Sequence, residues 1–203
     1  MKQPLQVVHD LHDYLYIVIQ KCLVTPNMLR NGRPLKHIGL LPREVVGLFF
    51  VCAVGRYITR EDWTLASDPD GQDGVILCKS GNREGEGFAT EQVYIPSHLD
   101  GDLTQLVLDS IFKNKAIKGE EYGKSRHLII FCDKNGSLDH QKIKKELISN
   151  NIFLSFWIVA KFSEQEWTYF VVATKTVTDP LRAYEVTILD NFRDWKVKSL
   201  GRI

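Results

Sequence analysis

Two acidic residues lie in segments of the sequence that are otherwise apolar. Asp73 comes just before Val75-Ile76-Leu77-Cys78, and Glu91 is the one charged residue of the segment 88–95. Burying a carboxylate alone is very costly, so each must be ion-paired, solvated at a cleft or bound to a cation. Oxygen ligands of this kind suit Mg²⁺, which often keeps several waters beside one or two carboxylates. The two residues together therefore predict a divalent-cation site.

The segments that carry these acids have the composition of two neighbouring strands. Residues 75–79 and 88–95 are rich in β-branched, aromatic and aliphatic side chains, and the polar, glycine-rich stretch 80–87 joins them. This pattern predicts an antiparallel β-hairpin. The hairpin would bring Asp73 and Glu91 close enough to share one ion.

Simpler structural explanations exist for the same acidic residues. Asp73-Gly74 can continue the turn formed by residues 67–72, where Asp, Pro and Gly are the expected types. Glu91 can face solvent on an edge strand. Glu44 lies in the first turn of a predicted helix, where a carboxylate interacts favourably with the helix dipole. These alternatives stay open at the level of sequence.

The N-terminal part of the chain differs in character from the rest. Residues 4–23 have apolar residues at helical spacing, which predicts an amphipathic helix. A loop rich in Pro, Gly and Asn follows, with the basic residues Arg30, Arg33 and Lys36. We therefore predict an N-terminal helical arm with a basic loop at 1–40 and an α/β domain at 41–203.

The remaining elements predict the fold class. Pro42 can occupy the first position of a helix that is apolar nearly all round and therefore buried. Further helices are predicted at 102–117 and 137–150, and further strands at 127–132, 153–162, 167–175 and 184–190. This order predicts an α/β protein with a mixed β-sheet flanked by helices.

Composition narrows the class of protein. The 203 residues are 44% hydrophobic and 25% charged, which is typical of a folded domain. The net charge is +1, so any nucleic-acid surface must be a local basic patch. The cysteines are widely spaced and fit buried free thiols: Cys22, Cys52, Cys78 and Cys132. The chain start lacks the layout of a secretory signal, and residues 14–24 are too short to span a bilayer. We expect a cytoplasmic protein with no membrane segment.

One arrangement of acidic residues resembles a known family. An acid in a helix, Asp-Gly opening a strand, Glu in the next strand, and then a helix and a strand are similar to the PD-(D/E)xK nucleases, the restriction endonuclease-like superfamily. The resemblance covers residues 42–132. It implies that Glu44, Asp73, Glu91 and Gln105 are site residues, and that Asp73 and Glu91 hold Mg²⁺. It also implies a restriction endonuclease-like core.

The family usually has a lysine two positions after the second acid, where it orients or activates the attacking water. Val93 occupies that position here, and Gln92 should point to the opposite face of the strand. A lysine would have to enter from elsewhere, with Lys79, Lys113 and Lys115 as nearby candidates. The sequence does not choose among them.

The resemblance implies metal-dependent hydrolysis of phosphodiester bonds in nucleic acid. The substrate would lie along basic patches, either Arg30, Arg33 and Lys36 or Lys113, Lys115 and Lys118. An alternative is a catalytically inactive relative that binds nucleic acid or assembles with protein, which Val93 favours. A third possibility is an interaction protein unrelated to nucleases, whose N-terminal helix docks a second copy or another protein. The sequence does not distinguish DNA from RNA.

Overall fold

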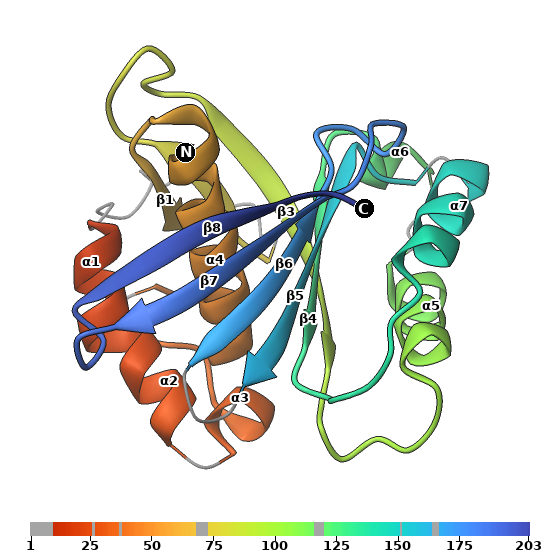
Figure 1. Cartoon of the computed structure of the whole chain (residues 1–203), viewed down its shortest axis with the longest axis horizontal. Coiled ribbons are helices and arrows are strands. Elements are labelled where there is room, and N and C mark those ends of the chain that lie inside the picture. The colour runs from red at the N-terminus through yellow and green to blue at the C-terminus, as the bar shows by residue number, and fades with distance from the viewer. Residues whose placement is uncertain are drawn as a thin grey trace.

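The structure is a computed structural model of the whole chain (Figure 1). It describes residues 10–25, 27–36, 38–67, 73–115, 120–150, 152–163 and 167–203. Three predicted features lie wholly or partly outside these residues. They are the first part of the N-terminal helix, the Asp-Pro-Asp-Gly turn at 68–71, and Lys118.

An eight-stranded sheet forms the centre of the protein, with its strands in sequence order. The pairs β3–β4 and β4–β5 are parallel, and all other neighbours are antiparallel. The strands are β1 (Trp63–Ala66), β2 (Val75–Cys78), β3 (Gly87–Ile95), β4 (His127–Cys132), β5 (Ser155–Ser163), β6 (Thr168–Ala173), β7 (Arg182–Leu189) and β8 (Asp194–Arg202). The predicted mixed sheet is confirmed, and so is the hairpin of β2 and β3.

Helices cover both faces of this sheet (Figure 1). One face has α1 (Leu11–Asp13), the π-helical η1 (Tyr14–Ile19), α2 (Gln20–Val24), α3 (Met28–Asn31) and α4 (Pro42–Thr59). The other face has α5 (Leu103–Asn114), α6 (Glu120–Gly123) and α7 (His140–Asn150). Parallel strands need a crossover connection, and α5 with α6 supplies it between β3 and β4, as α7 does between β4 and β5.

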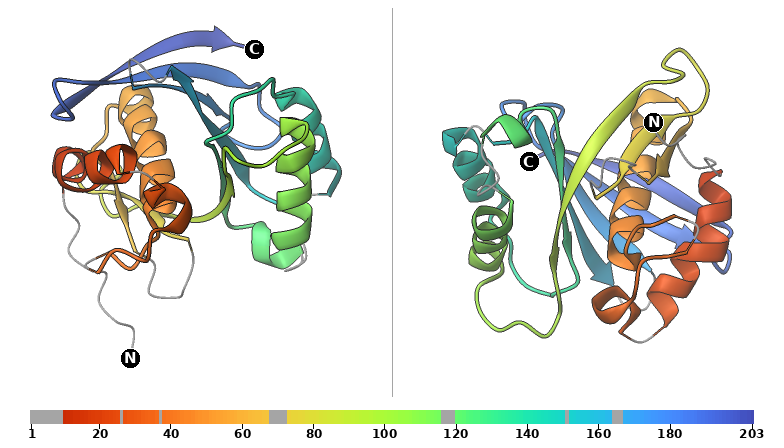
Figure 2. Two further views of the ribbon diagram at one scale, coloured as in Figure 1. Left: turned by 90° about the horizontal axis from the view of Figure 1, so that it is seen from below. Right: turned by 180° about the vertical axis from the view of Figure 1, so that it is seen from behind.

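Helix α4 lies in the hollow of the curled sheet. Pro42 occupies its first turn, as predicted, and its buried residues run from Val45 to Val54. It contacts β1 and each strand from β3 to β8. Figure 2 shows β7 and β8 bending over α4 on one side. A helix that is apolar nearly all round is stable only when it is enclosed in this way.

The N-terminal helical segments join the same core. Leu11, Leu15, Ile19 and Cys22 are buried in one hydrophobic cluster with α4. Segments α1, η1 and α2 follow one another without a break, where the sequence predicted a single amphipathic helix. A second cluster lies between α5, α7 and the opposite face of the sheet. The domain boundary near residue 40 stays a prediction, and residues on both sides of it pack in the same hydrophobic cluster.

Two strands were not among the predictions. In β8, Trp195 and Val197 face the core while Lys196 and Lys198 face outward. This period-two alternation is a strand pattern that the charged residues obscured. Strand β1 has four residues and pairs with β2 in the register Trp63 opposite Cys78. The four cysteines are buried free thiols, as predicted. Within the described ranges, no helix combines the length and the apolar character that crossing a bilayer requires.

Candidate functional site

Lys115 lies between the two acids that the sequence singled out. Its Nζ is 2.5 Å from Asp73 Oδ2 and 2.7 Å from Glu91 Oε2. The two oxygens are therefore at most about 5.2 Å apart, the total of those two contacts. Asp73 comes from the entry to β2, Glu91 from β3, and Lys115 from the C-terminal cap of α5. The hairpin thus brings the acids together, and α5 brings the cation.

Glu91 is completely buried but well supplied with donors. The Tyr122 hydroxyl donates a hydrogen bond to Glu91 Oε1, and Arg126 Nε is 3.9 Å from the same oxygen. Oε2 receives the Lys115 ammonium. The Arg126 guanidinium also stacks on the Tyr122 ring and donates to the Tyr122 carbonyl. These contacts compensate the large cost of burying a carboxylate.

The crossover between β3 and β4 supplies all three of these partners. Lys115 ends α5, Tyr122 belongs to α6, and Arg126 comes directly before β4. Parallel pairing of β3 with β4 requires such a connection. The same segment that permits the parallel pair therefore also neutralises Glu91.

Asp73 is held by the neighbouring strand as well as by Lys115. Its Oδ2 accepts a hydrogen bond of 2.7 Å from the backbone N–H of Gln92. The Gln92 side chain points to the other face of the sheet, as predicted, where Nε2 donates to the carbonyl oxygens of Glu44 and Asp73. The absence of a side chain at Gly47 makes room for it, because a Cβ there would lie 2.7 Å from Gln92 Oε1. Gln92 thus fixes the start of α4 relative to Asp73.

The Glu44 carboxylate is turned toward its own helix. Oε2 accepts a 2.7 Å hydrogen bond from the Leu41 backbone N–H, which satisfies a free donor at the start of α4. Burial raises the pKa of Glu44, the Leu41 hydrogen bond lowers it, and the nearby Asp73 raises it further, so the net direction is upward. Glu44 lines the same pocket as Asp73, but the hydrogen bond to Leu41 makes it a helix cap in this structure.

The other sequence candidates lie elsewhere. Gln105 is exposed on α5 and donates to Asp109, and it is not among the residues that line the pocket. Lys113 pairs with Asp109, and Lys79 is 3.9 Å from Asp10. Of the three lysines that the sequence left open, Lys115 is therefore the one at the acids. No pattern in the sequence pointed to Tyr122 or Arg126, because their roles depend on where the crossover places them.

A pocket of about 390 Å³ opens beside Asp73 and Lys115. This volume is within the range of roughly 300–1,000 Å³ that is usual for ligand sites. The pocket follows the edge of β3 beyond the end of its pairing with β2, which stops at Val75 opposite Ala89. Its lining comes from both faces of the sheet: Arg30, Arg43, Glu44, Asp73, Gln92, Val93, Tyr94, Pro96, Ser110, Asn114 and Lys115.

The electrostatics of the site keep Lys115 charged. Burial alone would lower the pKa of Lys115, but the charges and hydrogen bonds of Asp73 and Glu91 outweigh burial and raise it. Burial and the hydrogen bond to Glu91 raise the pKa of Tyr122 to about 12. At neutral pH both side chains are therefore proton donors, and neither is a base.

The carboxylate oxygens of Asp73 and Glu91 are chemically suited to bind one hard divalent cation. Two carboxylate oxygens, Asp73 Oδ2 and Glu91 Oε2, converge on one point, and an ammonium already stands there as a cation. Hard cations such as Mg²⁺ take such oxygens and complete their shell with water. Among the described residues no group of three or more His, Cys, Asp or Glu side chains is placed to hold a metal ion. Asp73 and Glu91 would therefore be its two protein ligands.

Comparison with known proteins finds no family model that matches the chain and no curated protein that is similar to it in sequence.

Proposed function

We propose that the protein is a Mg²⁺-dependent nuclease whose site is formed by Asp73, Glu91 and Lys115. The observation that carries the proposal is the position of the Lys115 ammonium on both carboxylates. The order of elements also supports it, because α4 with Glu44, the β2–β3 hairpin, α5 and β4 follow the pattern of the restriction endonuclease-like core. Lys115 then supplies from α5 the lysine that Val93 does not provide.

The side chains have separate tasks in this proposal. Two of the three N–H donors of Lys115 go to Asp73 and Glu91 in the structure; with Mg²⁺ at that point they would be released, and Lys115 would donate to a phosphate oxygen in the pocket. Tyr122 holds Glu91 through Oε1 and leaves Oε2 directed at the cation position. The Gln92 N–H holds Asp73 in the same way. Held by Asp73 and Glu91, Mg²⁺ would stabilise charge on the phosphate and lower the pKa of a water.

The reaction is hydrolysis of a phosphodiester. The oxygen of water forms a bond to phosphorus, the bond from phosphorus to one ester oxygen breaks, and that oxygen leaves with a proton. The contribution of Lys115 is to orient the phosphate and to stabilise its negative charge. The proposed substrate is nucleic acid, and cleavage of single-stranded and duplex DNA and RNA has to be compared directly.

Two neighbouring lysines provide the test. The full chain is incubated with these substrates in Mg²⁺ or in chelator, and Lys115→Ala is compared with Lys113→Ala. We expect a loss of about 100-fold or more for Lys115→Ala, as when a charge-stabilising donor is removed from an active site. Lys113→Ala should cleave like the unsubstituted protein, because Lys113 is exposed and pairs with Asp109. Asp73→Ala and Glu91→Ala should also lose cleavage, and full activity in both would refute the site.

A second function has an observation in its favour. Lys115 already neutralises both acids without any metal, so the cluster can persist as a permanent ion pair in a binding module. That protein would bind nucleic acid equally in Mg²⁺ and in chelator, and would release no product. Thermal unfolding with and without Mg²⁺ separates the two functions. The nuclease should gain stability with Mg²⁺, and the gain should vanish in Asp73→Ala, whereas the binding module should show no change.

A further inference from the structure

The pocket beside Lys115 has a second basic group on the other side of β3. Arg30 comes from α3 and Arg43 from the first turn of α4, whereas Lys115 follows α5 on the opposite face of the sheet (Figure 1). The three side chains line one pocket that crosses the edge of β3 at Gln92, Val93 and Tyr94. A ligand in the pocket can therefore contact Lys115 at one end and the two arginines at the other.

The charges of the lining do not cancel. The Asp73 carboxylate is in a salt bridge with Lys115, and the Glu44 carboxylate accepts a hydrogen bond from the Leu41 N–H and interacts electrostatically with Arg43. Within the described part of the chain, neither Arg30 nor Arg43 has a carboxylate within salt-bridge distance. The Arg43 guanidinium lies 5.8 Å from the centre of the Tyr94 ring. Two arginines that no salt bridge holds, in a concave site, favour an anionic ligand.

Close packing joins the two segments that carry the arginines. Gly32 ends α3 and packs on Pro42, so that a Cβ at Gly32 would lie 2.5 Å from Pro42 Cγ. Arg30 lies two residues before Gly32, and Arg43 directly follows Pro42. Each arginine is therefore close in sequence to this tight contact. A planar guanidinium matches the oxygens of a phosphate in a bidentate manner, which an ammonium does not.

We propose that Arg30 and Arg43 form a phosphate subsite, which binds a phosphate of the nucleic-acid strand next to the one that faces Lys115. This inference rests on the proposed function, because it assigns the anion to the substrate of the same site. The phosphate can be a terminal monoester or an internal diester of the strand. Both have the chemistry that paired guanidinium groups recognise.

Binding without cleavage tests the subsite. The full chain in chelator is titrated into a fluorescent single-stranded oligothymidylate labelled at its 3′ end, and anisotropy gives the Kd. The double variant Arg30→Gln/Arg43→Gln should bind at least about tenfold more weakly, as expected for the loss of charge-assisted hydrogen bonds. The slope of log K against log salt should fall by about 0.7 for one lost phosphate contact on a single strand.

Arg33→Gln is the matched control, because Arg33, which the sequence grouped with Arg30 in one basic patch, is exposed after the end of α3 and does not line the pocket. It should leave the Kd unchanged, and an equal weakening by Arg33→Gln and by the double variant would overturn the subsite. Probes with a 5′-phosphate and a 5′-hydroxyl separate the two sources. If the subsite binds a terminal phosphate, the unsubstituted protein prefers the 5′-phosphate probe and the double variant does not. If the subsite binds an internal phosphate, the unsubstituted protein binds both probes equally.

The outcomes distinguish this inference from the proposed function. Arginine-dependent binding in a protein that never cleaves supports the subsite and contradicts the nuclease. Lys115-dependent cleavage with an unchanged Kd and KM in the double variant supports the nuclease and overturns the subsite.

Discussion

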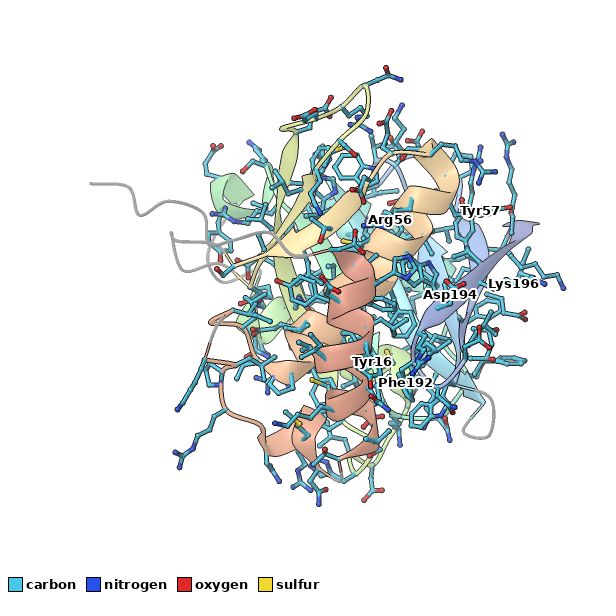
Figure 3. All side chains as sticks on the ribbon, turned by 90° about the vertical axis from the view of Figure 1, so that its left-hand side faces the viewer. Tyr16, Arg56, Tyr57, Phe192, Asp194 and Lys196 are labelled. Carbon is cyan, nitrogen blue, oxygen red and sulfur yellow. The ribbon has the colours of Figure 1, made fainter. Side chains whose placement is uncertain are left out.

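Helix α4 has a charged cluster near each of its ends, and the two clusters differ in what surrounds them. Near its start, Lys115 contacts Asp73 and Glu91 beside the pocket. Near its end, Arg56 contacts Asp62 and lies 3.8 Å from Asp10 at the cap of α1. Figure 3 shows Arg56 beside the beginning of α1. Both clusters combine two acids with one central cation, so residue composition alone does not separate them.

The difference lies in the bonds of the central cation. Arg56 Nε donates a 2.7 Å hydrogen bond to the Trp63 carbonyl, and the guanidinium lies 5.8 Å from the Trp195 ring. These contacts connect α4 to β1 and to β8. Lys115 contacts carboxylates alone and lines a pocket, whereas Arg56 does not line that pocket. A cation tied to backbone and aromatic groups stabilises the fold, and a cation held by acids at a cavity is available for a ligand.

The same substitution in each cluster gives the largest contrast. Asp73→Asn should lower the cleavage rate by about 100-fold or more, because it removes one charge at the proposed reaction centre. Asp62→Asn should leave the rate near that of the unsubstituted protein. Single-turnover rates in Mg²⁺ measure both. Equal losses in the two variants would show that the clusters do not differ in function.

For stability we expect the opposite order, with the larger effect in the cluster around Arg56. Arg56→Met should lower the free energy of unfolding by about 2 kcal/mol, because it leaves Asp62 without its cation and removes the bond to the Trp63 carbonyl. Lys79→Met is the control, since its 3.9 Å contact with Asp10 is half-exposed and should contribute less than about 1 kcal/mol. Urea unfolding measures both. An Arg56→Met protein as stable as the control would refute the structural role.

Alkaline pH should weaken the cluster around Lys115. The folded-state pKa of Lys115 is raised above 10.5, so its stabilisation is complete below pH 10.5 and is lost as pH rises through that higher pKa. Across this pH window, the free energy of unfolding should fall more steeply in the unsubstituted protein than in Lys115→Met. Tyr122, with a pKa of about 12, adds a loss of the same sign to both proteins. Parallel curves would show that Lys115 does not titrate with the cluster.

The smallest effect is expected at the surface of α5. Lys113 is 73% exposed and pairs with Asp109 one helical turn earlier. An exposed pair of this kind contributes little to stability, so Lys113→Ala should hardly change the unfolding midpoint. A shift as large as that of Arg56→Met would mean that exposed ion pairs matter as much as the enclosed cluster.

The sequence could predict those parts of the site that depend on local pattern. The alternation and the turn residues around 80–87 predicted the hairpin, and the hairpin places Asp73 and Glu91 together. Lys115 could not be selected, because its position depends on how far α5 extends and on the direction in which its last turn leaves the sheet. The structure ends α5 at Asn114, so the capping residue Lys115 turns toward the acids. Gln105 lies nearly three turns earlier, on an exposed part of the helix.

The fold shows the same limit. Continuous apolar segments, such as α4 and β4, were predicted closely, whereas β8 was missed because its outward lysines masked its inward Trp195 and Val197. The place of Arg43 in the pocket had no sequence signal of its own. It depends on the packing of α3 against the start of α4.

The charged cluster around Lys115 can form only after the crossover between β3 and β4 has been synthesised. Glu91 and Asp73 are synthesised before Lys115, Tyr122 and Arg126, and β3 cannot complete its parallel pairing until β4 has followed. Until those residues and β4 have been made, the two acids therefore lack these three partners, and β3 is not yet paired along this edge. The charged centre appears together with the core rather than before it. If the site cleaves nucleic acid, a nascent chain that ends before β4 cannot do so, and cleavage begins only when the sheet has closed around α4.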